Sequence, residues 1–386
     1  MNRLKLASCL LLFSTYLWSA APSFLTISDI HYGTTNKIGN GYDTGDVLWN
    51  TTLPKFTDLH KKADFILLLG DLPTHSLMMS DAKKALLETK IFHDLYLADT
   101  EHKPIFYIPG NNDSLTGNYQ PFAKEGKSPL TYAYDWQGAC AYCDKLIIDK
   151  TAMESDGYYT TYVLPDNKDI LLIVLNTTQF AKLPFWMSPY LNQEIDADRQ
   201  LKWLAAQLKN HKAKQLLIAM HEEPGLDYRN QMVWQQKPQN EFIALLNTYQ
   251  QNYQQISLLT SHSHYDELRK ITLKNDKHIY AYSAPSISRR HYNNPAMKIF
   301  QLNDNLVMQD FTTYYTTDET QWKDSHYQAI KSQSNIFSTC QGLTLPACLN
   351  SLTTNQVCEL MEGKAIYSTK NEDKKGFNCL NTYQIN

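Results

Sequence analysis

The chain has 386 residues, of which 43% are hydrophobic and 19% are charged, and its net charge is −3. This balance is typical of a globular protein, and the length allows one large domain with a small addition. A weakly acidic chain without runs of Lys and Arg has no basic surface for nucleic acid, so a nucleic-acid polymer is not expected as a partner.

Residues 1–21 have the pattern of a secretory signal peptide. Arg3 and Lys5 precede a mostly apolar stretch, and the small residues 19–21 offer a cleavage site. The stretch is too short to span a bilayer, and no later segment is long and apolar enough to do so. We therefore expect a secreted or periplasmic protein with no stable membrane span.

Short apolar runs alternate with amphipathic patterns along the chain, which favours an α/β fold of sheets and helices. Five runs of strand length cover residues 24–28, 65–69, 105–109, 216–220 and 256–260. Further strands are expected at residues 278–284, 297–302 and 306–313.

Three helices are expected between the strands. Ser80 can cap the first, and one face of that helix carries Leu87, Ile91 and Leu95. The second covers residues 198 to about 211, and the third presents an apolar face between residues 242 and 249.

Two parts of the chain do not follow this pattern. Residues 114–162 are irregular and rich in Gly, Pro and aromatic residues, and loops of that length are more often functional than idle. Beyond residue 316 the composition becomes polar and then cysteine-bearing. We expect a main domain over residues 22–316 and a small C-terminal module over residues 317–386.

Six cysteines remain without the signal segment, and an even number in an exported protein favours disulfides. Cys140 and Cys143 are close enough in sequence to pair with each other. Three pairings are possible among the other four, which are Cys340, Cys348, Cys358 and Cys379. A zinc site at these four is less favoured, because their spacings are not paired C-x₂-C units.

Side chains that can bind metal ions follow each of the first five apolar runs. They are Asp29, His31, Asp71, Asn111, His221, His262 and His264. A rigid sheet can direct short side chains from adjacent loops to one point beyond the carboxyl ends of its strands. Asp71 is the natural carboxylate to bridge two ions about 3.5–4 Å apart, because Gly70 permits a tight turn there. Each residue alone is a weak signal, but the ordered set predicts a two-metal hydrolase.

In this order, the residues resemble the calcineurin-like metallophosphoesterase superfamily over about residues 24–315. The resemblance implies a four-layer α/β fold and in-line attack on phosphorus by a hydroxide that bridges two divalent metal ions. Zinc is the expected metal, and manganese and iron are alternatives that suit the same ligands. The implied ligands are Asp29, His31 and His264 for one ion, Asn111, His221 and His262 for the other, and Asp71 between them.

A closer resemblance is to the acid sphingomyelinase-like phosphodiesterases. Four stretches carry it, namely residues 70–75, 157–159, 284–295 and 310–315, with a looser match at residues 221–225. It implies a phosphodiester substrate, either a small molecule such as a nucleotide or pyrophosphate, or a lipid headgroup ester. Few residues separate the signal segment from the first strand, so no lipid-binding domain is expected there, which favours the soluble substrates.

Two positions depart from the family pattern. Asn112 replaces the usual His, and an Asn side chain can donate a hydrogen bond but not a proton. His75 is then the candidate general acid, with Asn112 beside it at the catalytic site, unless the leaving group needs little acid help. Ser261 stands where Gly usually precedes the first His of the H-x-H pair.

Other residues and other functions remain open. Asn293 and Asn294 are candidates for substrate binding, and a simple Asn-Asn-Pro turn is the structural alternative. Asp113 is expected to orient a neighbouring ligand or to close a turn. A phosphomonoesterase of the same fold and a non-catalytic secreted binding protein are alternative functions. A purple acid phosphatase is less favoured, because Thr74 stands at the position of its Tyr ligand.

Overall fold

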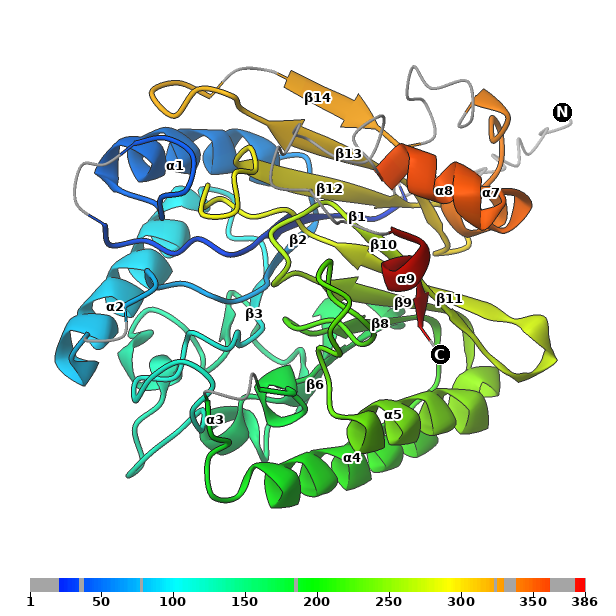
Figure 1. Ribbon diagram of the computed structural model, residues 1–386, viewed down its shortest axis with the longest axis horizontal. Helices are drawn as coiled ribbons and strands as arrows, with labels where there is room; N and C mark the ends of the chain where they lie inside the picture. The colour runs from blue at the N-terminus through cyan, green and yellow to red at the C-terminus, as the bar shows by residue number, and fades with distance from the viewer. Residues whose placement is uncertain are drawn as a thin grey trace, which may run out of the picture.

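The structure is a computed structural model, and it describes residues 21–34, 38–76, 79–183, 187–322, 325–329, 338–361 and 379–385. Within these ranges, two mixed β-sheets pack against each other, and helices cover their outer faces (Figure 1). Residues 1–20 of the predicted signal segment lie outside the described residues. Across the ranges that the structure does describe, no helix is long and apolar enough to cross a membrane.

The first sheet has β1 (Ser23–Ile27) at its centre. This strand pairs in parallel with β2 (Phe65–Leu68) and antiparallel with β12 (Ala296–Leu302), and β3 (Ile105–Tyr107) extends the parallel part. The order β14-β13-β12-β1-β2-β3-β4 is completed by β4 (Cys140–Ala141), β13 (Met308–Tyr315) and β14 (Ser325–Gln328).

The second sheet has a core of four parallel neighbours. They are β7 (Asn167–Val174), β8 (Ala213–Ala219), β9 (Tyr253–Thr260) and β11 (His278–Ser283). The order is β15-β10-β11-β9-β8-β7-β6-β5. The remaining strands are β5 (Ile147–Asp149), β6 (Tyr159–Leu164), β10 (Leu268–Thr272) and β15 (Gln384–Ile385).

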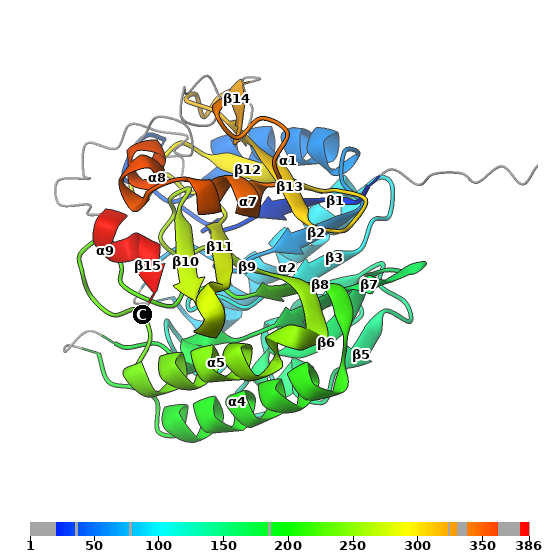
Figure 2. The same cartoon turned by 90° about the vertical axis from the view of Figure 1, so that its right-hand side faces the viewer.

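Helices cover the outer face of each sheet, which gives four layers (Figure 2). Helices α1 (Asp46–His60) and α2 (Asp81–Ala98) lie on the first sheet, and α4 (Gln193–Asn210) and α5 (Gln236–Tyr249) lie on the second. The short helices are α3 (Met153–Asp156), α7 (Leu345–Ser351), α8 (Thr354–Met361) and α9 (Cys379–Tyr383), with 3₁₀ turns η1 (Pro129–Tyr132), η2 (Thr177–Gln179), η3 (Gln250–Asn252) and η4 (Lys274–Asp276).

The alternating side chains of β7 show why the layers stack in this way. Leu172 and Val174 belong to the core between the two sheets, while Leu171 and Ile173 belong to the core beneath α4 and α5. Successive residues of a strand point to opposite faces, so an unbroken apolar run is buried on both sides. The predicted four-layer α/β fold is confirmed.

The helix predictions were mostly correct. The Ser80 hydroxyl accepts a hydrogen bond from the backbone N–H of Lys83, and α2 begins at the next residue. Helix α4 begins at Gln193, five residues before the predicted start at 198. Helix α1 was not predicted, because Pro54 lies inside it and a proline normally interrupts a helical pattern.

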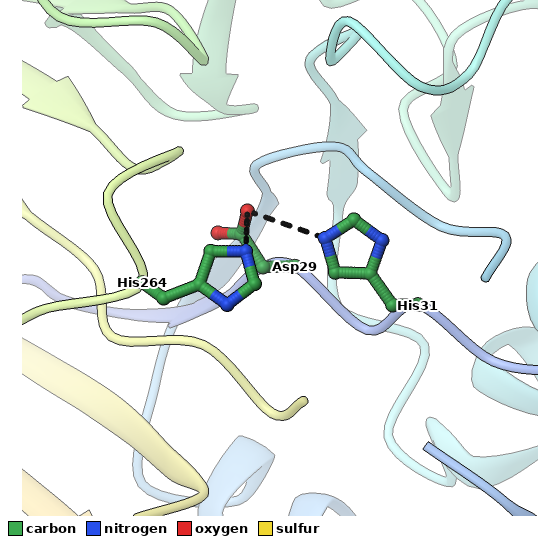
Figure 3. A group of neighbouring side chains, drawn as sticks. All are labelled: Asp29, His31 and His264. Carbon is green, nitrogen blue, oxygen red and sulfur yellow. Dashed lines mark ion pairs between the residues drawn. The ribbon is translucent and has the colours of Figure 1, made fainter. Parts of the chain in front are cut away.

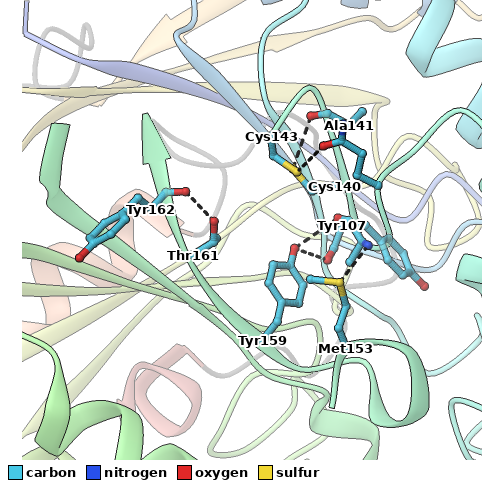
Figure 4. The surroundings of a disulfide bond; sticks show 10 residues. Tyr107, Cys140, Ala141, Cys143, Met153, Tyr159, Thr161 and Tyr162 are labelled. Carbon is cyan, nitrogen blue, oxygen red and sulfur yellow. Dashed lines mark hydrogen bonds between the residues drawn. A yellow bond between two sulfur atoms is a disulfide. The ribbon is translucent and has the colours of Figure 1, made fainter. Parts of the chain in front are cut away.

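Three disulfides link the six cysteines. Cys140–Cys143 lies beside Tyr107, Met153 and Tyr159, where the Tyr159 hydroxyl donates to the Tyr107 carbonyl (Figure 4). Cys340–Cys348 and Cys358–Cys379 staple the C-terminal region and select one of the three possible pairings. The boundary at residue 316 stays a prediction, and β15 joins the second sheet by pairing with β10.

Candidate metal centre

The carboxyl ends of parallel strands from both sheets meet at one place. The loop after β1 supplies Asp29 and His31, and the loops after β2 and β3 supply Asp71 and Asn111. From the second sheet, the loop after β8 supplies His221, and the loop after β9 supplies His262 and His264. Because side chains beyond the carboxyl ends of neighbouring strands converge, the fold concentrates these groups.

The predicted ligands form groups whose ligand atoms all lie within 4.8 Å of one another. Asp29, His31 and His264 form one such group (Figure 3), and Asp71, His221 and His262 form another. Asp71 and His31 also form a group with His75. Asp71 Oδ2 lies 3.5 Å from both His31 Nε2 and His221 Nε2, so this carboxylate stands between the two groups.

Several atoms that face the cluster have no hydrogen-bond partner in the described part of the chain. They are Asp29 Oδ1, His31 Nε2, Asn111 Oδ1 and His221 Nε2. A buried polar atom without a partner carries a desolvation cost, so native proteins rarely leave several of them together. Oxygen and imidazole nitrogen donors gathered in this way fit divalent metal ions, which would satisfy their lone pairs.

The outer ring nitrogens of two histidines are fixed by the backbone. His31 Nδ1 lies 3.1 Å from the Pro73 carbonyl, and His221 Nδ1 lies 2.6 Å from the Leu69 carbonyl. A carbonyl only accepts, so Nδ1 carries a hydrogen in both rings and Nε2 is the nitrogen that faces the carboxylates of the cluster. The Ser261 hydroxyl also lies 2.9 Å from His221 Nδ1, a contact that the sequence alone did not indicate.

Burial and neighbouring charges set the protonation of these side chains. Burial raises the pKa of Asp29 to about 7, and the positive charge of His221 partly offsets that rise. Burial also lowers the pKa of His31 and of His262 to about 3, so both rings are neutral at pH 7, the form that binds metals. Burial opposes the charged form of His221 too, but Asp71 and Asp29 raise its pKa well above the ordinary value.

The backbone at this cluster adopts an uncommon conformation. Five of the seven predicted ligands have positive φ angles between 45° and 69°, namely Asp29, His31, Asp71, His262 and His264. Such a conformation costs about 1–3 kcal/mol for a non-glycine residue, although Asp and His tolerate it better than most. Gly110 lets the neighbouring loop approach, because a Cβ at that position would overlap the carboxylate of Asp71. The turns therefore aim short side chains inward at some cost in strain.

Asp113 fastens the loops that carry Asp71 and Asn111. Its carboxylate accepts hydrogen bonds from the backbone N–H groups of Asp71, Leu72 and Gly110 and from the Tyr107 hydroxyl, at 2.7–3.0 Å. Burial and the charge of Asp71 raise its pKa to about 6. Asp113 therefore supports ligands without facing the cluster, which is the orienting role that sequence analysis considered.

The two predicted catalytic residues are placed differently. The His75 ring stacks on the His31 ring with centroids 3.9 Å apart, and its Nδ1 lies 3.1 Å from the carboxylate of Asp43. Burial disfavours the charged ring, but the hydrogen bond and charge of Asp43 raise the pKa of His75 above its ordinary value. The Asn112 side chain donates to the Pro73 carbonyl at 2.6 Å, so it supports the loop that carries His75.

The segment that carries the predicted substrate-binding residues, 288–294, forms a turn with internal hydrogen bonds. Asn293 is buried, and its amide donates to the Ser288 carbonyl at 2.8 Å, while Asn294 is half-buried beside it. Arg289 forms an ion pair with Glu319 at 2.8 Å. These contacts match the turn that sequence analysis offered as the structural alternative, and substrate binding by Asn293 and Asn294 stays a prediction.

A cavity of about 270 Å³ lies beside the cluster. Asp71, Asn111, His262 and His264 line it together with His75, and the opposite wall is the loop after β8, from Glu223 to Val233. The Arg269 guanidinium stabilises this loop, because it donates hydrogen bonds to the Glu223 carboxylate and the Leu226 carbonyl, both at 2.6 Å. A larger cavity of about 630 Å³ near the start of α4 contains none of the predicted site residues.

The family model of the calcineurin-like phosphoesterases matches residues 22–266, which is more than half of the chain. The chain belongs to the calcineurin-like phosphoesterases. It is therefore a hydrolase that acts on phosphoric esters, as the sequence predicted. The family and the His/Asp cluster together support a site for two divalent metal ions. A comparison with curated proteins finds no similar sequence.

Three solved structures that match the chain are distant from it in sequence. A purple acid phosphatase from yellow lupin (Lupinus luteus) has 9% identity and a TM-score of 0.47, over 80% of this chain and 54% of that one. A 5′-nucleotidase from Candida albicans has 13% identity and a TM-score of 0.40, over 89% and 58%. The NAD nucleotidase of Haemophilus influenzae has 13% identity and a TM-score of 0.38, over 79% and 54%. The chain thus spans little more than half the length of these proteins.

Proposed function

We propose that this phosphoesterase is an exported phosphodiesterase, secreted or periplasmic, that works with two divalent metal ions, zinc in preference to manganese or iron. The observation that carries the proposal is the cluster of carboxylates and imidazoles, in which Asp29 Oδ1, His31 Nε2 and His221 Nε2 find no hydrogen-bond partner among the described residues. The proposed ligands are Asp29, His31 and His264 for one ion, Asn111, His221 and His262 for the other, and Asp71 between them.

When bound, two such ions polarise the phosphoryl oxygens and make a water molecule acidic enough to be a nucleophile at neutral pH. The chain orients the groups around them. Asn112 donates its backbone N–H to Asp71 Oδ1 at 2.7 Å, which leaves Asp71 Oδ2 turned toward the imidazoles. His75 lines the same cavity and is the proposed general acid that protonates the leaving oxygen.

The choice of a diester rests on the resemblance to the acid sphingomyelinase-like phosphodiesterases. Within that class, the cavity favours a soluble anionic substrate over a bilayer lipid. Lys182 and Arg229 are exposed cations in its lining, and Tyr228 lines the same cavity. A nucleotide or pyrophosphate diester offers further anionic oxygens to such cations, whereas a zwitterionic headgroup offers fewer.

The deciding experiment compares hydrolysis of bis-p-nitrophenyl phosphate and p-nitrophenyl phosphate by the purified, metal-loaded protein. We expect a diester preference that disappears on chelation and returns with added zinc. Asp71→Asn should abolish turnover, whereas the control Asp99→Asn should retain it, because Asp99 is a buried carboxylate paired with His60 outside the cluster.

A monoester preference would replace the proposal with a phosphatase of the same fold. Bound metal without hydrolysis of either ester would favour a binding protein. If the diester is preferred, nucleotide diesters and sphingomyelin vesicles then separate the two substrate classes. N-terminal sequencing of the exported protein tests the predicted removal of residues 1–21.

A further inference from the structure

Asp43 is a buried carboxylate beside the cluster that sequence analysis did not select. It lies in the loop between β1 and α1, is 5% exposed, and follows no apolar run. An ionised carboxylate at such a position needs several donors to offset the loss of water.

The Asp43 carboxylate joins three loops at the edge of the cavity. It accepts hydrogen bonds from the Thr74 hydroxyl and the His75 backbone N–H, both at 2.8 Å, and from the Ser288 hydroxyl at 3.0 Å. Both of its oxygens also lie 3.1 Å from His75 Nδ1. Because these donors come from the loops after β2 and β11 and none of them is the imidazole, the position of Asp43 is fixed independently of the His75 ring.

These contacts fix the orientation of the His75 ring and keep a hydrogen on its Nδ1. A carboxylate only accepts, so Nδ1 of His75 carries a hydrogen and Nε2 is the nitrogen left to face the cavity. The His75 ring also stacks on the His31 ring, with their centroids 3.9 Å apart and their planes at 25°. This stacking restricts rotation of the His75 ring out of its plane. An acid that must meet a leaving oxygen within hydrogen-bond reach gains from this preorganisation.

We infer that Asp43 is a positioning residue, which holds the imidazole of His75 so that Nε2 delivers a proton to the leaving oxygen. This inference rests on the proposed function, in which His75 is the general acid. As the phosphorus–oxygen bond to the leaving group breaks, that oxygen takes the Nε2 proton, and the water consumed in hydrolysis supplies the proton that restores His75. Asp43 keeps its charge and its bond to Nδ1 throughout, as the carboxylate does in a Ser-His-Asp triad.

A pair of substrates that differ only in leaving group tests this role. p-Nitrophenolate departs without a proton, whereas phenolate needs one far more. Methyl p-nitrophenyl phosphate and methyl phenyl phosphate are therefore compared for the wild type and for Asp43→Asn. An Asn amide can donate to Nδ1, which then carries no hydrogen, so the ring is neutral and its Nε2–H is a much weaker acid. We expect kcat to fall about 100-fold for the phenyl ester and less than about threefold for the p-nitrophenyl ester.

Three variants separate positioning from structural or general electrostatic effects. Asp43→Glu keeps an acceptor and should recover part of the loss on the phenyl ester. Asp46→Asn removes an exposed carboxylate three residues away, which bonds the Tyr32 hydroxyl, and should leave both rates unchanged. Asp43→Asn combined with His75→Asn should be no slower than His75→Asn alone, because both act through one proton transfer.

An equal loss on both esters, or no loss on either, would overturn the inference while leaving the phosphodiesterase proposal intact. If Asp43→Asn fails to fold, as judged by circular dichroism and metal content, Ser288→Ala replaces it. That variant removes one bond that holds Asp43, so it should show a smaller loss confined to the phenyl ester, and an equal loss on both would again refute the role. If the wild type hydrolyses only monoesters, the proposed diesterase fails, and the corresponding aryl monoesters test Asp43 separately.

Discussion

Replacement of Lys298 by methionine should lower the free energy of unfolding by about 3–5 kcal/mol. Lys298 lies on β12 of the first sheet, and its ammonium group forms an ion pair with Asp266, which follows β9 of the second sheet. Both side chains are fully buried. The ammonium also donates to the Ser283 carbonyl at 2.8 Å, and the Thr313 hydroxyl donates to the other Asp266 oxygen at 2.8 Å.

The magnitude follows from what the substitution leaves behind. Methionine keeps most of the side-chain volume against the Phe311 ring, over which the ammonium now lies at 4.1 Å, so little cavity forms. The Asp266 carboxylate, however, loses the ammonium group that faces it and keeps the hydrogen bond from the neutral Thr313 hydroxyl. A buried charge left without its partner accounts for the expected 3–5 kcal/mol.

Denaturant unfolding of the metal-loaded protein, with disulfides intact, measures the change. The double variant Lys298→Met with Asp266→Asn should recover at least half of the loss, because the uncompensated charge is then gone. A Lys298→Met protein within about 1 kcal/mol of the wild type would refute this account of the ion pair. A double variant no more stable than the single one would also refute it.

Three further changes test other parts of the fold. Burial raises the pKa of Glu88 well above its ordinary value of 4.5, so the folded protein keeps a proton that the unfolded chain releases. The free energy of unfolding of the wild type, compared with that of Glu88→Gln, should therefore be greatest below pH 4.5. The difference should fall by about 1.4 kcal/mol per pH unit until the pKa of Glu88 in the folded protein is reached. Curves of unfolding free energy that stay parallel from pH 4 to 8 would contradict this. Replacing both Cys358 and Cys379 by serine should cost about 3 kcal/mol in urea unfolding, because the 21-residue separation closes a loop in the unfolded chain, and an unchanged midpoint would argue against it. Added zinc at about 1,000 times its Kd should raise stability by about 4 kcal/mol in thermal scans, an effect that His221→Ala should weaken markedly.

The sequence was sufficient for the parts of the fold that are buried on both faces. Strand β2 and the second half of β8 lie between two apolar layers, so each reads as an unbroken apolar run, and the residues that follow it are easily located. Helix α1 gave no such signal, because Pro54 interrupts its pattern. The apolar face of α1 is recognised from its buried residues in the structure, such as Leu48, Phe56 and Leu59.

The supporting residues of the site could not be predicted in the same way. Asp43 and Ser288 are 245 positions apart, and their contact exists only because β1 and β11 bring their loops together. The internal hydrogen bond of Asn293 could not be predicted either, because the sequence does not show that its amide meets the Ser288 carbonyl. Ligand types at strand ends are a local pattern, whereas the partners that orient them depend on the whole topology.

The left-handed backbone at five of the proposed ligands has a consequence for protein engineering. A search for stabilising substitutions by backbone geometry would rank Asp29, His31, Asp71, His262 and His264 among the best places for glycine, since glycine adopts positive φ without strain. Each such change would gain stability in the metal-free protein and remove a ligand atom from the cluster. Variants selected only for thermal stability would thus lose the proposed metal ligands and with them the activity. Selection for stability should therefore be combined with selection for retained metal content.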